Sequence, residues 1–269
     1  MNRPSRLTDL LADFFEDANR AGVTDLPAAP ALEPVPLTEK ALRADPGAEP
    51  PVQAPDDAMA KRPSQTPLEK TLAEIKPGLS TRAKEAILRD LARAVSACTL
   101  CPELVANRTQ TVFGVGNPDA ELVFIGEGPG VDEDRQGEPF VGRSGQLLTD
   151  IIVKGMKMRR EDVYICNVVR CRPPGNRNPL PNEAACCRPF LDGTLRTIAP
   201  KYICCLGAVA AQNLLQTDQA IGRLRGKIHD YRGIQVVCTY HPAYLLRNPA
   251  AKRDTWEDIK LLLRRMGRM

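Results

Sequence analysis

The sequence predicts an α/β fold in which a mostly parallel, four-stranded sheet is covered by helices on both faces. Four short apolar runs rich in valine, isoleucine and tyrosine have the composition of strands, namely ELVFIGEGPG (121–130), DVYICNVVRC (162–171), KYICCLGAVA (201–210) and IQVVCTYHP (234–242). Helical sequence separates each run from the next, and strands that alternate with helices form parallel sheets. Because such sheets bind ligands beyond the carboxyl ends of their strands, the residues after each run are candidates for a functional site.

The chain ahead of these runs divides into three segments. Residues 7–21 place leucine and phenylalanine at helical spacing, which predicts a short amphipathic helix that packs on the body or docks a protein partner. Eleven of the 24 prolines fall between 26 and 80, so this segment is expected to be a disordered linker. A helix over 81–97 leads into Cys98. The expected domains are therefore an N-terminal helix (1–25), a linker (26–80) and a folded body (81–269).

Charge is unevenly distributed along the chain. Residues 1–80 carry 9 basic and 13 acidic side chains, whereas 81–269 carry 28 basic and 20 acidic ones. A basic body behind an acidic leader is compatible with a polyanionic partner and equally with an ordinary mixed-charge surface. The N-terminus has no signal-peptide pattern, and no stretch reaches the roughly 18 apolar residues of a membrane span. We expect a cytoplasmic protein, away from membranes, whose nine cysteines stay reduced.

Paired cysteines are the strongest chemical signal in the sequence. Cys98 and Cys101 form a C-x2-C pair, and Cys171 and Cys187 form a second pair with fifteen residues between them. Four thiolates suit zinc or an iron–sulfur cluster, and the wide second pair favours the cluster. Cys186 is an alternative to Cys187. The cysteines inside the apolar runs are expected to be small buried residues, namely Cys166, Cys204, Cys205 and Cys238.

Two of the runs end in residues suited to a ligand pocket. The turn GEGPG (126–130) lacks the spacing of a dinucleotide or phosphate-binding loop, and acids follow it. Beyond the turn, Phe140 is a candidate platform for stacking on a base or, alternatively, a core residue. Asn167 ends the second run, where its amide can read the edge of an amide or imide, or make an ordinary turn.

The motif HPAYLLR (241–247) follows the fourth run. His241 is one of only two histidines, and at a strand end it can donate a hydrogen bond to developing negative charge. The four residues from Tyr244 to Arg247 combine an apolar wedge with a cation, which suits insertion into a base stack with a phosphate contact. The alternative is a helix start that buries its leucines.

Taken together, these residues resemble the family 4 uracil-DNA glycosylases, the iron–sulfur members of the uracil glycosylase superfamily, over about 95–266. The resemblance rests on GEGPG with its following Glu-Asp, EPFVGRSGQLL, the strand-end Asn167 before VVRCRPPGNR, the four cysteines and HPAYLLR. It implies a three-layer α/β/α uracil-DNA glycosylase fold and a 4Fe–4S cluster. It also implies hydrolysis of the bond between uracil and deoxyribose in DNA, which leaves an abasic site and initiates base excision repair.

The resemblance carries roles over to individual positions. The cluster ligands would be Cys98, Cys101, Cys171 and Cys187. The uracil pocket would use Glu127, Gly128, Pro129, Phe140, Asn167 and His241, with Phe140 stacked on the base, Asn167 on its O4/N3 edge and His241 facing O2. The catalytic residues would be Glu127, Glu133 and His241, with Glu133 also crowding C5 against thymine. The DNA contacts would be Arg143, Arg172, Tyr244, Leu245, Leu246 and Arg247.

Several features qualify what the resemblance implies. Gly128 stands where the best-known glycosylase family has an acidic water activator, so the activator stays open among the backbone, Glu127 and a later acid. One related subgroup has a basic insertion and bonds covalently to uracil. This chain has the loop GNRNPLP at that place, so we expect it to release uracil and turn over without a covalent complex. Because hydrolysis needs no electron transfer, we expect the cluster to pin residues 171–187 and present arginines to phosphates, namely Arg170, Arg172 and Arg177.

Three other interpretations compete with a uracil-specific enzyme. A family 5 glycosylase of broader specificity has a nonacidic residue at the Glu127 position, so Glu127 argues against it. A non-catalytic DNA-binding or polymerase-accessory module would bind DNA without releasing uracil, and the intact pocket residues argue against that. A zinc-bound structural domain would be colourless, whereas an iron–sulfur protein is brown. We expect a monomer in any of these cases.

Overall fold

The computed structural model describes residues 75 and 78–269. The predicted helix at 7–21 and nearly all of the predicted linker at 26–80 lie outside these residues. The helix expected over 81–97 is present as α3 (Thr81–Ser96), and the Ser80 side chain caps its first turn by accepting from the Ala83 amide. Buried side chains of α3 recur at helical spacing, so one face of the helix packs on the body, through Leu88, Leu91 and Val95.

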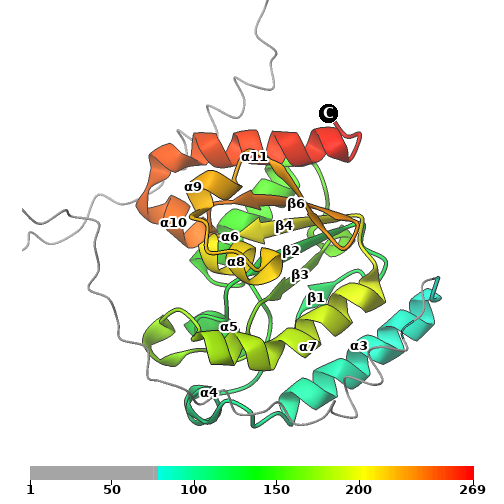
Figure 1. The fold of residues 1–269 in the computed structure, drawn as a ribbon, viewed down its shortest axis with the longest axis vertical. Coiled ribbons are helices and arrows are strands. Elements are labelled where there is room, and N and C mark those ends of the chain that lie inside the picture. Colours follow the sequence, from blue (N-terminus) through cyan, green and yellow to red (C-terminus); the bar gives the residue numbers. More distant parts are fainter. Residues whose placement is uncertain (1–74, 76–77) are drawn as a thin grey trace, which may run out of the picture. The chain divides into compact units, whose positions relative to one another are not determined.

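The sheet has six strands rather than the four that we predicted, in the order β1-β3-β2-β4-β6-β5 (Figure 1). The four predicted runs form its parallel centre, as β2 (Leu122–Gly126), β3 (Tyr164–Asn167), β4 (Tyr202–Leu206) and β6 (Ile234–Thr239). Two antiparallel strands close the edges, β1 (Val115–Gly116) and β5 (Ile228–Tyr231). Edge strands need no continuous apolar run, because they are not buried on both faces.

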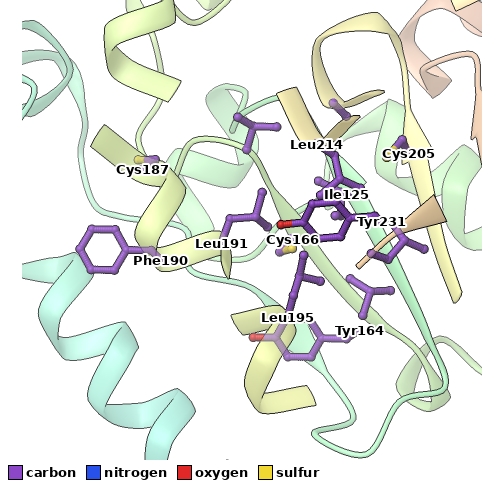
Figure 2. Packing of buried hydrophobic residues seen from close by; sticks show 14 of the residues in the cluster. Ile125, Tyr164, Cys166, Cys187, Phe190, Leu191, Leu195, Cys205, Leu214 and Tyr231 are labelled. Atoms are coloured by element: carbon purple, nitrogen blue, oxygen red, sulfur yellow. The ribbon is translucent and has the colours of Figure 1, made fainter. Parts of the chain in front are cut away.

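Alternating side chains of the strands build two separate cores. Val123 and Ile125 point to the face covered by α3, α7 (Pro181–Ile198) and α8 (Ala208–Leu215). Leu122 and Phe124 point to the opposite face, which α6 (Arg143–Asp150) and α11 (Lys252–Arg265) cover. Figure 1 shows α11 on one side of the sheet and α7, with α3 beyond it, on the other, and Figure 2 shows the side chains of α7 packed on the strands. The structure therefore has the expected three α/β/α layers.

Short helices occupy the connections. They are α4 (Pro102–Asn107), α5 (Val131–Gln136), α9 (Ile221–Leu224) and α10 (Pro242–Arg247), together with a π-helical turn (Ile151–Gly155) and single 3-10 turns (Arg160–Asp162, Pro174–Asn176 and Pro249–Ala251). None of the helices in the described part of the chain combines the length and the hydrophobicity that crossing a bilayer requires.

Residues 171–187 differ from the purely irregular loop that we expected. Helix α7 begins at Pro181, and the carboxylate of Glu183 accepts from the Leu180 amide 2.7 Å away, so the helix start is capped. Cys187 therefore lies within a helix, where neighbouring turns fix its position.

Candidate active site

A cavity of about 390 Å³ opens at the carboxyl ends of the parallel strands. Residues from four connections converge on it, namely Glu127, Gly128, Pro129, Glu133, Phe140, Asn167, His241, Tyr244 and Arg247. A further wall comes from the proline-rich segment, with Asn176, Arg177 and Asn178. The sequence reasoning did not place this wall in the pocket, although its run of polar side chains between prolines was a signal that could have found it.

Phe140 is held in a conformation that a non-glycine residue adopts rarely. Its φ is 56°, in the left-handed region, and its side chain is 6% exposed. The guanidinium of Arg160 donates to the carbonyl oxygens of Pro139 at 2.9 Å and of Phe140 at 3.1 Å. A Cβ added to Gly145 would lie 2.0 Å from the Phe140 carbonyl carbon, so only glycine lets α6 approach this closely. Arg160 is a site residue that no sequence motif indicated.

Glu133 fixes the other side of the Phe140 segment. Its carboxylate accepts from the backbone amides of Gly130 at 3.1 Å, Val141 at 2.9 Å and Gly142 at 2.9 Å. Both carboxylate oxygens are thus engaged by the chain itself, and the side chain is 8% exposed. This arrangement suits a residue that shapes the turn around Phe140, in place of the catalytic role and the contact with C5 that the resemblance implied.

Asn167 lines the pocket and carries an unpaired polar atom. The side chain is 2% exposed, and its Oδ1 has no hydrogen-bond partner, whereas the backbone carbonyl accepts from Arg170 at 2.7 Å. A buried acceptor left unpaired costs roughly 1–3 kcal/mol, so a ligand that donates to it regains that free energy. Gly126 makes the room, because a Cβ there would lie 2.4 Å from this Oδ1.

His241 is a neutral hydrogen-bond donor aimed at the same cavity. Its Nδ1 accepts from the Ala243 amide at 3.2 Å, which caps α10 and places the ring proton on Nε2. Burial, followed by the charge of Arg247, lowers the pKa of His241 to about 4. The ring centroids of His241 and Phe140 are 5.6 Å apart. Burial also raises the pKa of Glu127 above its ordinary value.

The predicted DNA wedge is only half exposed. Leu245 is 1% exposed and packs inside the body, and its contact with DNA stays a prediction. Tyr244 and Leu246 are 39% and 43% exposed, because each lies about 100° around α10 from the buried Leu245. The Tyr244 ring stacks on Tyr240 with centroids 5.0 Å apart, which holds it at the rim of the pocket.

The arginines near the cysteines differ from one another in exposure. Arg170 is fully buried and its guanidinium donates inward, so the prediction that it is presented to phosphates was wrong. Arg177 forms a double hydrogen-bonded ion pair with Glu183 and a second pair with Glu103. Arg172 is half-buried and donates to Asn176, while Arg143 is exposed at the start of α6.

Four cysteines gather at one place beside α4 and α7. Burial raises the pKa values of Cys101 to about 12 and of Cys187 to about 11, with neighbouring thiols adding to it, Cys186 before Cys98 at Cys101 and Cys171 before Cys98 at Cys187. Cys98 likewise acts on Cys171, so the two sequence pairs converge. Cys186 lies beside Cys101 as well. The other four cysteines are buried, as predicted, namely Cys166, Cys204, Cys205 and Cys238.

Comparison with known proteins identifies the superfamily. The model of the uracil DNA glycosylase superfamily matches residues 113–260. The chain is 46% identical over 181 residues to a type-4 uracil-DNA glycosylase of Thermotoga maritima, covering 66% of this chain and 93% of that protein. Type-4 enzymes of Archaeoglobus fulgidus and Sulfurisphaera tokodaii are 43% and 39% identical over 181 residues each, covering 64% of this chain in both cases and 90% and 82% of those proteins. With the pocket at the strand ends, these matches establish that the chain belongs to the uracil-DNA glycosylase superfamily and confirm its resemblance to family 4.

Proposed function

We propose that the protein is a monofunctional uracil-DNA glycosylase, which hydrolyses the N-glycosidic bond of deoxyuridine in DNA and so starts base excision repair. The observation that carries the proposal is the unpaired, buried Oδ1 of Asn167 in a pocket that also holds Phe140 and His241. The similarity to named type-4 uracil-DNA glycosylases supports it.

The pocket residues account for recognition of an extruded base. A base inside a duplex cannot reach the cavity, so the nucleotide must leave the stack, which costs a few kcal/mol. Stacking on the fixed ring of Phe140 offsets part of that cost. The Oδ1 of Asn167 accepts the N3–H of uracil, and its amide N–H donates to O4. Cytosine has no N3–H and carries an amino group at C4, so the same amide rejects it.

Bond cleavage develops negative charge on the departing uracil and positive charge on the sugar. His241 faces O2 with its Nε2–H, and the neutral ring carries its proton on this nitrogen because Nδ1 accepts from the Ala243 amide. Glu127 is the pocket carboxylate that remains for holding the attacking water, since Glu133 is committed to backbone amides. The raised pKa of Glu127 makes its carboxylate the stronger base.

The same proposal includes a 4Fe–4S cluster held by Cys98, Cys101, Cys171 and Cys187. Four converging thiols are the donor set of such clusters. Among the residues that the structure describes, no group of three or more His, Cys, Asp or Glu side chains is arranged to hold a single metal ion. The wide separation of Cys171 and Cys187 in the sequence favours a cluster over zinc. When bound, it would cross-link α4, α7 and the segment between them.

Exposed and half-buried residues of α6, α10 and the proline-rich segment would contact DNA. Arg143, Arg172 and Arg247 offer cations for phosphates, while Tyr244 and Leu246 offer exposed apolar surface to fill the gap left by the flipped base. Among them, Tyr244 and Arg247 line the cavity itself.

Release of uracil from a single-stranded oligonucleotide with one central dU tests the function. Strand breakage after alkali is expected for dU and not for T in its place. Asn167→Ala should lose at least tenfold in single-turnover rate, because its hydrogen bonds to the base are gone. An intact, iron-loaded protein that binds this DNA without releasing uracil would leave the non-catalytic binding module as the better interpretation.

A further inference from the structure

One guanidinium connects the two cysteine pairs. Arg108 follows α4 and is partly buried. Its Nη1 lies 3.0 Å from Sγ of Cys171, and its Nη2 donates to the carbonyl oxygens of Cys98 at 3.0 Å and of Ser96 at 3.4 Å. Arg108 therefore touches one cysteine of each pair, through the side chain of Cys171 and through the backbone of Cys98.

This arrangement needs the two terminal nitrogens of an arginine guanidinium. The two donors point to groups that lie in segments more than 60 residues apart in sequence. A lysine ammonium has the same charge but only a single nitrogen, so it cannot reproduce the two fixed directions. The following residue, Thr109, donates its amide to the buried carboxylate of Asp134 at 2.9 and 3.0 Å, which holds the backbone beside Arg108 in place.

We propose that Arg108 is the positioning residue of the cysteine cluster, and the proposal rests on the 4Fe–4S cofactor proposed above. Before loading, Arg108 holds Cys98 and Cys171 at one place. After loading, its Nη1–H donates to the Cys171 thiolate. A cationic donor to a ligand sulfur stabilises the more negative oxidation state of a cluster, so Arg108 raises the reduction potential.

A carboxylate beside this site acts in the opposite direction. Asp134 accepts from the Thr109 amide next to Arg108, and its negative charge disfavours further negative charge on the nearby sulfur. Removal of the guanidinium leaves this carboxylate without the cation beside it, which should destabilise the reduced cluster further. The expected direction is therefore a lower potential in a variant that lacks the cation.

The test uses the full-length chain with Arg108→Gln and Arg108→Lys. Arg89→Gln is the matched control, because Arg89 is an exposed arginine of α3 with a weak ion pair to Glu85. Three quantities are measured on each protein: iron per chain, the potential in an anaerobic titration in which dithionite supplies one electron, and the rate of iron loss to a chelator. Circular dichroism checks that each protein is folded.

For Arg108→Gln we expect the ratio of reduced to oxidised cluster at a fixed potential to fall about tenfold, which is about 59 mV for one electron. Iron loss should be at least several-fold faster, and Arg108→Lys should restore the potential in part but not the iron retention. A folded Arg108→Gln protein that takes up no iron, while Arg89→Gln loads fully, also supports the proposal.

Two results separate the possible failures. If wild-type protein contains no iron, the cofactor proposal fails and Arg108 has no cluster to position. If wild-type and Arg108→Gln proteins load equally, with the same potential and the same rate of iron loss, the cofactor stands and the role of Arg108 is refuted.

Discussion

Gly126→Ala should disable the pocket with a single added methyl group. Gly126 ends β2, and a Cβ there would lie 2.4 Å from Oδ1 of Asn167 and 2.5 Å from Cζ of Phe140. Ordinary contacts begin at 3.4 Å, so both uracil-binding side chains must move by about 1 Å. A misplacement of about 1 Å costs on the order of 100-fold in rate, or roughly 2.7 kcal/mol of transition-state stabilisation.

The assay is single-turnover release of uracil from the dU oligonucleotide, with thermal unfolding measured on the same preparations. Overpacking at Gly126 should also destabilise the fold by roughly 1–3 kcal/mol, so rates are compared well below the unfolding transition. Gly222→Ala is the matched control, since a Cβ at Gly222 meets nothing within 4 Å. A folded Gly126→Ala protein within threefold of the wild-type rate would refute the assignment of Asn167 and Phe140 to the base.

Three further predictions concern the loop, the pH profile and the cysteines. Arg160→Gln removes two charged hydrogen bonds from the Phe140 segment. We therefore expect a loss of roughly 1–3 kcal/mol in stability and at least a tenfold lower rate of uracil release. Unchanged activity would argue against the support of Phe140 by Arg160. The wild-type rate should fall on acidification through the raised pKa of Glu127, because its carboxylate is then protonated. Glu127→Gln should have a lower rate that falls only near pH 4, where His241 gains a proton. If the pH–rate profile of Glu127→Gln falls at the same pH as that of the wild type, Glu127 is not the base. Cys171→Ser should lose iron and have a lower melting temperature, and metal analysis and calorimetry measure these two effects. A stable, active, iron-free variant would contradict the structural role of the cluster.

The sequence predicted the fold best where buried elements have a recognisable pattern of apolar residues. The four central strands are covered on both faces, so valine and isoleucine runs marked them. The edge strands escaped prediction because β1 has only two residues and β5 reads IHDY, in which the polar His229 and Asp230 interrupt the apolar pattern. The start of α7 was predictable in principle, since Pro181 and Glu183 are a helix-start signal that the density of prolines around them obscured.

Side-chain direction was the information that the sequence could not supply. Leu245 and Leu246 are chemically identical neighbours, and only the rotation of α10 after its cap at His241 decides that the first is buried and the second exposed. Arg170 reads as a surface cation, yet the structure buries it with hydrogen bonds to Asn167 and Thr194. Burial of an arginine depends on partners distant in sequence, which no local pattern reports.

Arg177 connects the cysteine cluster to the pocket structurally, without any reaction at the cluster. Its guanidinium lines the cavity and pairs with Glu183 on α7, one helical turn before Cys187, and with Glu103 on α4, two residues after Cys101. Both helices that present cysteines are therefore tied to one wall of the pocket. If loss of the cluster lets α4 and α7 separate, the two ion pairs cannot both persist, and the wall formed by 176–178 loses its support. A cofactor with no part in hydrolysis would in this way still be required for full activity.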